Sequence, residues 1–180
     1  MIAAVPKLRW WLWGLVAFAV VIGLSAGITA PESVTLGITD HQTAGTAVRV
    51  DEIQGQWAAG GVRTLAIISM LGDLVFIGIY GFGSWIAGRS FMRLGGLLRA
   101  VGAIIAAAAL VFLATDYCET LLQLVQMIRD EGSDSLAGIA ATVQPVKIIA
   151  WIVTFVGVLL GLGWHRLVRR PSESTESKSA

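Results

Sequence analysis

Four apolar segments dominate this 180-residue chain, at about residues 10–29, 64–87, 100–123 and 146–167. Each reaches the length of about 20 residues that an α-helix needs to cross about 30 Å of hydrocarbon. Because lipid offers backbone groups no hydrogen-bond partners, spanning segments of this kind are expected to be helical. With 56% hydrophobic and 14% charged residues, the chain also lacks the polar surface of a soluble domain. The sequence therefore predicts an all-α fold, a polytopic four-helix transmembrane bundle.

The cations are sorted by their position along the chain. Nine of the 13 Lys and Arg residues lie on one predicted side of the membrane, and the opposite side has four, which are accompanied by seven acids. The nine are Lys7, Arg9, Arg89, Arg93, Arg99, Arg166, Arg169, Arg170 and Lys178. The remaining four are Arg49, Arg63, Arg129 and Lys147. The positive-inside rule then predicts a multi-pass protein of the cell (inner) membrane with both termini in the cytoplasm.

The two ends of the chain set the expected domain limits. Residues 1–170 are predicted to form one transmembrane domain, and the polar residues 171–180 a disordered cytoplasmic tail. The first apolar segment also has the basic flank of a signal peptide, although it is longer than the usual 7–15 apolar residues. Cleavage after Ala30 would place Pro31 at the new terminus, whereas cleavage after Gly27 stays open. A retained anchor is expected.

Two polar segments are expected on the outer side of the membrane. Residues 30–61 join the first two spans, and their weak alternation of apolar and polar residues predicts short strands or an extended lid. Residues 130–144 are expected to form a shorter loop before the last span, with Gly132 and Ser133 as loop markers.

Three carboxylates and one lysine lie within or beside the apolar segments, where charge is costly. Asp73 precedes Arg89 by sixteen residues, and Asp116 follows Arg99 by seventeen. At 1.5 Å per residue, both acids lie about 24–26 Å above the inner arginine level. Glu119 lies one turn further out, at about 30 Å, and Lys147 at about 28 Å above Arg166 by the same count. The four charged groups are therefore predicted to share one layer in the outer third of the bilayer.

The spacing within this layer favours contact between its members. Asp116 and Glu119 are three residues apart and so share a helix face. Two carboxylates this close resist ionising together, and Lys147 is expected to offset this by pairing with one of them. Tyr117 lies in the same stretch, and Ser69 lies one turn from Asp73. Two interpretations stay open, a polar lock that fixes helix register and a site for a ligand, ion or proton.

The residues needed for common catalytic chemistry are missing from the spans. The chain has one cysteine, Cys118, which excludes an intrachain disulfide and paired redox thiols. Its two histidines, His41 and His165, are too few and lie too far out toward the ends of the spans to hold a haem in a membrane bundle. No Ser–His pair, phosphate-binding glycine loop or HExxH motif is present. We therefore expect no catalytic residues, no metal site, no cofactor and no enzymatic activity.

Small residues predict close helix packing. Gly157 and Gly161 form a GxxxG motif in the last span, and Gly102 and Ala106 form a similar pair in the third. Such pairs let helix backbones approach and gain dispersion contacts. Packing within one bundle is favoured over a dimer interface.

One local resemblance concerns the third span. The run Asp116-Tyr117-Cys118-Glu119-Thr120, after an alanine-rich stretch, resembles the D-x-x-E-N step of uncharacterised bacterial membrane proteins, with Thr120 in place of the asparagine. That resemblance implies no activity. Small multidrug transporters also have four helices and a membrane acid, but their acid lies in the first helix, where this chain has no charge between Trp10 and Thr29.

Two functions follow as hypotheses. The first is a membrane protein that binds a small ligand, a lipid or a membrane partner through an outward-facing carboxylate cluster. The alternative is a proton- or cation-coupled small transporter that acts as an oligomer. The expected partners are the lipid bilayer, anionic lipid at the inner arginine rim at about 1 kcal/mol per cation, and a second copy or another membrane protein. Nothing in the sequence indicates nucleic-acid binding.

Overall fold

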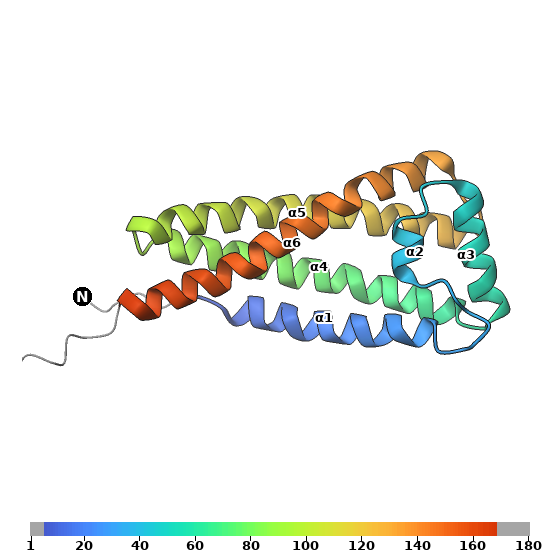
Figure 1. Ribbon diagram of the computed structural model, residues 1–180, viewed down its shortest axis with the longest axis horizontal. Coiled ribbons are helices and arrows are strands. Elements are labelled where there is room, and N and C mark those ends of the chain that lie inside the picture. The colour runs from blue at the N-terminus through green and yellow to red at the C-terminus, as the bar shows by residue number, and fades with distance from the viewer. Residues whose placement is uncertain (1–5, 169–180) are drawn as a thin grey trace, which may run out of the picture.

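Four long helices run along the long axis of the molecule, and two short ones lie at one end of it (Figure 1). In the computed structural model, which describes residues 6–168, the long helices are α1 (Arg9–Ile28), α4 (Arg63–Met92), α5 (Gly96–Arg129) and α6 (Asp134–Val168). All four are long and apolar enough to cross a membrane. The short helices are α2 (Ile38–Gln42) and α3 (Ala47–Ala59). The predicted all-α membrane bundle is confirmed; the predicted tail, 171–180, lies outside the described residues.

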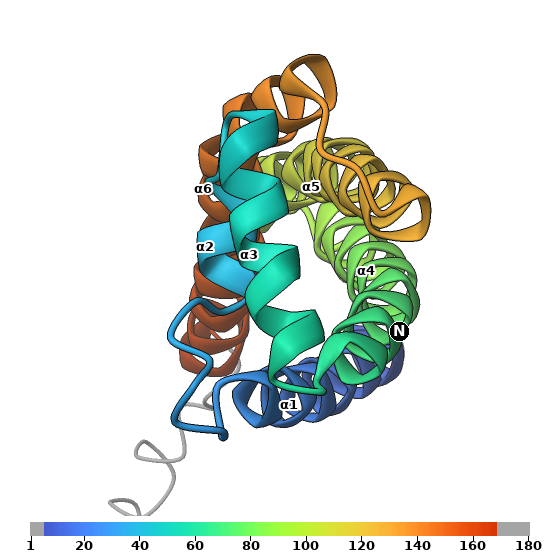
Figure 2. The ribbon, with the colours of Figure 1, turned by 90° about the vertical axis from the view of Figure 1, so that its right-hand side faces the viewer.

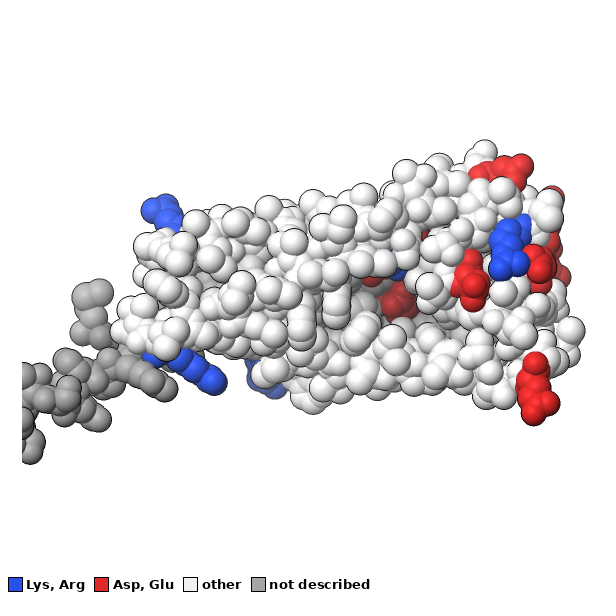
Figure 3. Space-filling model, viewed as in Figure 1, with Lys and Arg blue, Asp and Glu red and all other residues white. Residues whose placement is uncertain are grey.

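The long helices pack in chain order, α1 on α4, α4 on α5 and α5 on α6. Their shared core is aromatic, with Tyr80 and Phe112 in an edge-to-face contact at 5.3 Å and Trp151 and Phe155 stacked at 5.3 Å. The sides of the bundle are covered with exposed apolar residues, which a membrane helix turns toward lipid. Figure 3 shows exposed acidic side chains gathered, with a basic one among them, at the end that carries α2 and α3, and basic side chains toward the other end.

Glycines set how closely the long helices approach each other. A side chain on Gly83 would meet the backbone of Trp10 and Trp11 within 2.5 Å, so α1 lies directly against α4 there. The predicted small-residue pairs are used in the same way: Gly157 lies against Ile105 and Gly161 against Phe91, all within one chain. The GxxxG motif therefore serves packing within the bundle.

The segment 30–61 differs from its prediction. It contains no strand but the helices α2 and α3, with α3 crossing the end of the bundle (Figure 2). Val50, Ile53, Gln54 and Trp57 are its buried residues, and this is helical spacing. Thr46 caps the helix by accepting a hydrogen bond from the Arg49 amide at 3.4 Å. We call α2, α3 and their connections, residues 29–62, the cap.

The predicted loop 130–144 is also wrong over most of its length. Helix α6 begins at Asp134, eleven residues before Pro145, and buries Ala137 and Ala140 against the rest of the protein. The Asp134 carboxylate accepts a hydrogen bond from the Ala47 amide at 2.7 Å, so the start of α6 anchors the start of α3. The loop between α5 and α6 is only residues 130–133. It contacts the cap through a hydrogen bond that the Gly132 amide donates to the Asp51 carboxylate at 2.6 Å.

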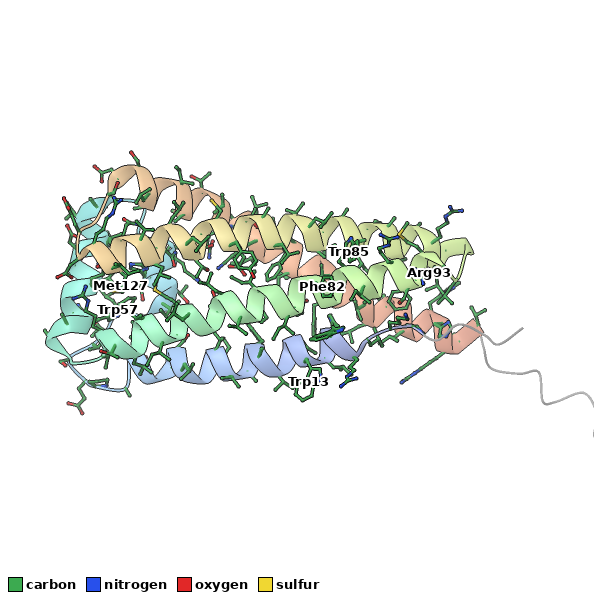
Figure 4. All side chains as sticks on the ribbon, turned by 180° about the vertical axis from the view of Figure 1, so that it is seen from behind. Trp13, Trp57, Phe82, Trp85, Arg93 and Met127 are labelled. Carbon is green, nitrogen blue, oxygen red and sulfur yellow. The ribbon has the colours of Figure 1, made fainter. Side chains whose placement is uncertain are left out.

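The underside of the cap is apolar and closely packed. Trp57 is fully buried, and its indole N–H donates to the Leu36 carbonyl at 2.7 Å. It packs in one cluster with Ile28 and Met127, and Figure 4 shows Trp57 and Met127 together at this end. His41 packs against Trp57 in a tilted ring contact at 5.1 Å, and its Nε2 lies 3.2 Å from Gln54 Nε2. Helix α2 is thereby held between α3 and the long helices.

Burial of His41 makes the cap sensitive to acid. Burial lowers the pKa of His41 from 6.5 to about 4, and a hydrogen bond that the imidazole donates to the Gln123 side chain offsets part of this effect. An unfolded chain therefore binds this proton more readily than the folded one between those values. The stabilisation that comes from burying a neutral His41 is fully present above pH 6.5, and it is lost as the pH falls toward 4. We expect the free energy of unfolding to fall by about 2 kcal/mol through His41 between pH 7 and pH 5.

This expectation is checked by equilibrium unfolding in bicelles at both pH values. The variant His41→Gln should lose that part of the pH dependence. The control variant His165→Gln, in the last turn of α6 and away from the cap, should keep it. An equal pH dependence in wild type and His41→Gln would show that His41 does not contribute.

Candidate functional site

Lys147 joins the two acids of α5 from across the helix interface. Its Nζ lies 2.9 Å from Asp116 Oδ1 and 2.9 Å from Glu119 Oε1. All three side chains are buried, Glu119 completely. Because Asp116 and Glu119 occupy one face of α5, a single ammonium on α6 reaches both of them. The predicted pairing of Lys147 is therefore present with both acids rather than one.

Glu119 has one satisfied oxygen and one unsatisfied. Its Oε1 also accepts a hydrogen bond from Gln123 Nε2 at 3.3 Å, whereas its Oε2 is buried and has no hydrogen-bond partner among the described residues. A buried carboxylate oxygen without a donor is costly, so Oε2 is the less well satisfied of the two Glu119 oxygens.

Asp73 on α4 is held differently from the other two acids. Its Oδ2 accepts a hydrogen bond from the Thr120 hydroxyl at 3.1 Å, and it is partly exposed to a cavity. Among the described residues, no Lys or Arg nitrogen forms an ion pair with it. Asp73 is therefore the acid of this layer whose charge is not balanced by a direct contact.

A cavity of about 340 Å³ lies beside these groups, between the long helices and below α2. Its polar wall includes Asp73, Asp116, Thr120, Gln123 and Lys147, and its apolar wall carries four aromatic rings. These rings are Phe18, Phe76, Phe112 and Trp151. Figure 3 shows the mouth as a hollow between α1 and α6 in which acidic and basic side chains are visible. A volume of this size accommodates a small organic molecule.

The structure brings most of the predicted residues to this place, but not all. Ser69 lines the cavity, and its hydroxyl lies 2.8 Å from the hydroxyl of Ser25 on α1. Glu119 lies behind Lys147 and is not part of the lining. Tyr117 does not belong to the group: its hydroxyl donates to the Leu74 carbonyl at 3.1 Å, away from the cavity. Tyr117 follows Asp116 directly, and a helix turns by about 100° per residue, so its side chain points elsewhere.

Several lining residues were not among the predicted ones. Thr120 is the hydrogen-bond donor to Asp73, and its position one turn after Asp116 on the same helix face was the available signal. The rings of Phe18 and Trp151 gave no signal, because an aromatic residue in a membrane helix ordinarily packs against its neighbours. Across residues 6–168, no group of three or more His, Cys, Asp or Glu side chains is arranged to hold a metal ion.

Comparisons of the chain with protein-family models, curated proteins and solved structures find no match. The chemistry of the cavity is thus the basis for a functional assignment.

Proposed function

We propose that this integral membrane protein binds a small positively charged ligand in the cavity, with the Asp73 carboxylate as the anionic contact. One observation carries the proposal: Asp73 faces the cavity, no Lys or Arg among residues 6–168 forms an ion pair with it, and it accepts a hydrogen bond from the neutral Thr120 hydroxyl. An unpaired carboxylate in a membrane is costly and gains most from a cationic partner.

The remaining charges support a division of roles. Lys147 is already bound to Asp116 and Glu119, so these three groups have at most one net negative charge between them. Together they fasten α5 to α6 and form the wall behind the ligand. The four aromatic rings supply apolar contact and a cation–π surface for the body of a bound cation. In the predicted orientation, with both termini cytoplasmic, the cavity lies in the outer half of a cell membrane.

The experiment compares three probes of one shape and different charge: 2-phenylethylammonium, propylbenzene and 3-phenylpropanoate. Binding to the purified protein in lipid nanodiscs is measured by calorimetric titration. We expect the cation to bind at least tenfold more tightly than the other two, and Asp73→Asn to remove that preference, a loss of about 1.4 kcal/mol or more. Glu32→Gln, which changes an exposed acid that is not part of the cavity lining, should bind the cation like wild type. Equal binding by wild type and Asp73→Asn would refute the assignment.

The same site suits a transporter, and flux separates the two functions. A binding protein predicts no uptake of the labelled cation into vesicles in the presence of a proton gradient. Uptake that depends on the gradient and is lost in Asp73→Asn would establish transport instead.

A further inference from the structure

The cavity has its opening on the side of the bundle rather than at its end. Helix α2 closes the end toward the cap through Ile38, Thr39 and Gln42, and α3 crosses above it (Figure 2). The hollow in Figure 3 is seen at right angles to the long axis of the molecule. When the long helices span a bilayer, this side faces lipid.

The opening exists because α1 and α6 meet over only part of their length. Toward the end near the termini they are joined by aromatic pairs, Trp11 with Phe155 at 5.9 Å and Phe18 with Trp151 at 5.4 Å. Beyond the second pair, Ile22 of α1 and Ile148 of α6 line the cavity and are also exposed on the surface, at 53% and 41%. These two isoleucines form the rim, with the aromatic pair below it and α2 above it.

The walls change from apolar at the rim to charged inside. A molecule that enters past Ile22 and Ile148 meets the rings of Phe18 and Trp151 and then the carboxylate of Asp73. An apolar rim followed by aromatic rings and then a carboxylate is complementary to a chain of methylene groups that ends in an ammonium group. A phospholipid headgroup fits less well, because its phosphate would face Asp73, and the ammonium of Lys147 is already bound at 2.9 Å to two carboxylates.

We propose that the ligand is a long-chain alkylammonium amphiphile that enters the cavity sideways from the bilayer, between α1 and α6, with its head at Asp73 and its chain leaving over Ile22 and Ile148. This inference rests on the proposed function. It adds the class of ligand and the route by which it arrives. The chain of such a ligand stays among lipid acyl chains, so only the head and the first few methylene groups occupy the cavity of about 340 Å³.

The test uses a dodecylammonium probe that carries a photoreactive diazirine just beyond the first few methylene groups, at the part of the chain that would cross the rim. The full-length protein in vesicles is irradiated with the probe, and labelled residues are mapped by mass spectrometry. We expect labelling on α1 and α6 around Ile22 and Ile148, reduced at least tenfold in Asp73→Asn. Ile148→Trp should reduce it at least fivefold by narrowing the rim, whereas Ile149→Trp, an exposed neighbour outside the cavity lining, should leave it unchanged.

The outcomes separate the two proposals. Asp73-dependent labelling at Thr39 and Gln42 of α2, without labelling at the rim, would overturn the sideways entry and leave the cation site standing. Labelling of equal strength in wild type and Asp73→Asn would overturn both, and the titration with 2-phenylethylammonium would then also show no dependence on Asp73. Rim labelling that Ile148→Trp does not reduce would overturn the route as well.

Discussion

Replacing Lys147 with methionine is expected to lower the free energy of unfolding by about 3–5 kcal/mol at neutral pH. Lys147 is the ion-pair partner of both Asp116 and Glu119, and all three side chains are buried. Methionine keeps much of the side-chain length but removes the ammonium, which leaves two adjacent carboxylates in a medium of low dielectric constant. Unfolding in bicelles, followed by the loss of tryptophan fluorescence, measures the effect.

A compensating variant tests whether charge is the cause. In Lys147→Met combined with Asp116→Asn and Glu119→Gln, no charge of this group remains, and most of the lost stability should return. Because protons can neutralise the stranded acids, the loss in the single variant should also shrink as the pH is lowered. A triple variant as unstable as Lys147→Met would show that packing of the lysine chain, and not its charge, holds α5 to α6.

The contact between Lys147 and its two acids is the part of the site that sequence reasoning could reach. Depth along a membrane helix follows from counting residues, and the positions of Asp116, Glu119 and Lys147 relative to the basic ends agreed to within about a turn. The three-residue spacing of the acids then placed both on one face. Direction around the helix axis was not available from depth alone, which is why Tyr117 was grouped with residues that it does not contact.

The cap and the cavity depend on information that a local pattern does not contain. Alternation in residues 30–61 was weak enough to fit a strand, and only the burial of Val50, Ile53 and Trp57 on one side shows that the period is helical. The cavity depends on the partial separation of α1 and α6, which are far apart in sequence and meet through Phe18 and Trp151. Apolar composition predicted the four spans, but it does not specify which pairs of helices leave a gap.

A second large effect is expected where the backbones of α4 and α5 are in close contact, at Gly88 and Gly102. A Cβ atom on Gly102 would lie 2.6 Å from the Met92 amide nitrogen and in contact with the Gly88 carbonyl oxygen. Both are backbone atoms, so the clash is relieved only by separating the helices. Gly102→Ala should therefore lower the free energy of unfolding by about 1–3 kcal/mol, and Gly102→Leu by about 3 kcal/mol or more.

The matched control is Gly23→Ala in α1, where nothing lies within 4 Å of the added atom. There the substitution should be neutral or stabilising, by up to about 1 kcal/mol, because alanine is the better helix former. Equal effects at Gly23 and Gly102 in bicelle unfolding would show that the α4–α5 contact can adjust without loss of stability.

A large effect at Gly102 alone would mean that this contact keeps α4 and α5 in register. It would then also keep Asp73 of α4 opposite Thr120 of α5. Gly102→Ala should then also weaken binding of 2-phenylethylammonium in the fraction that remains folded, although residue 102 lies about four turns of α5 from Asp116.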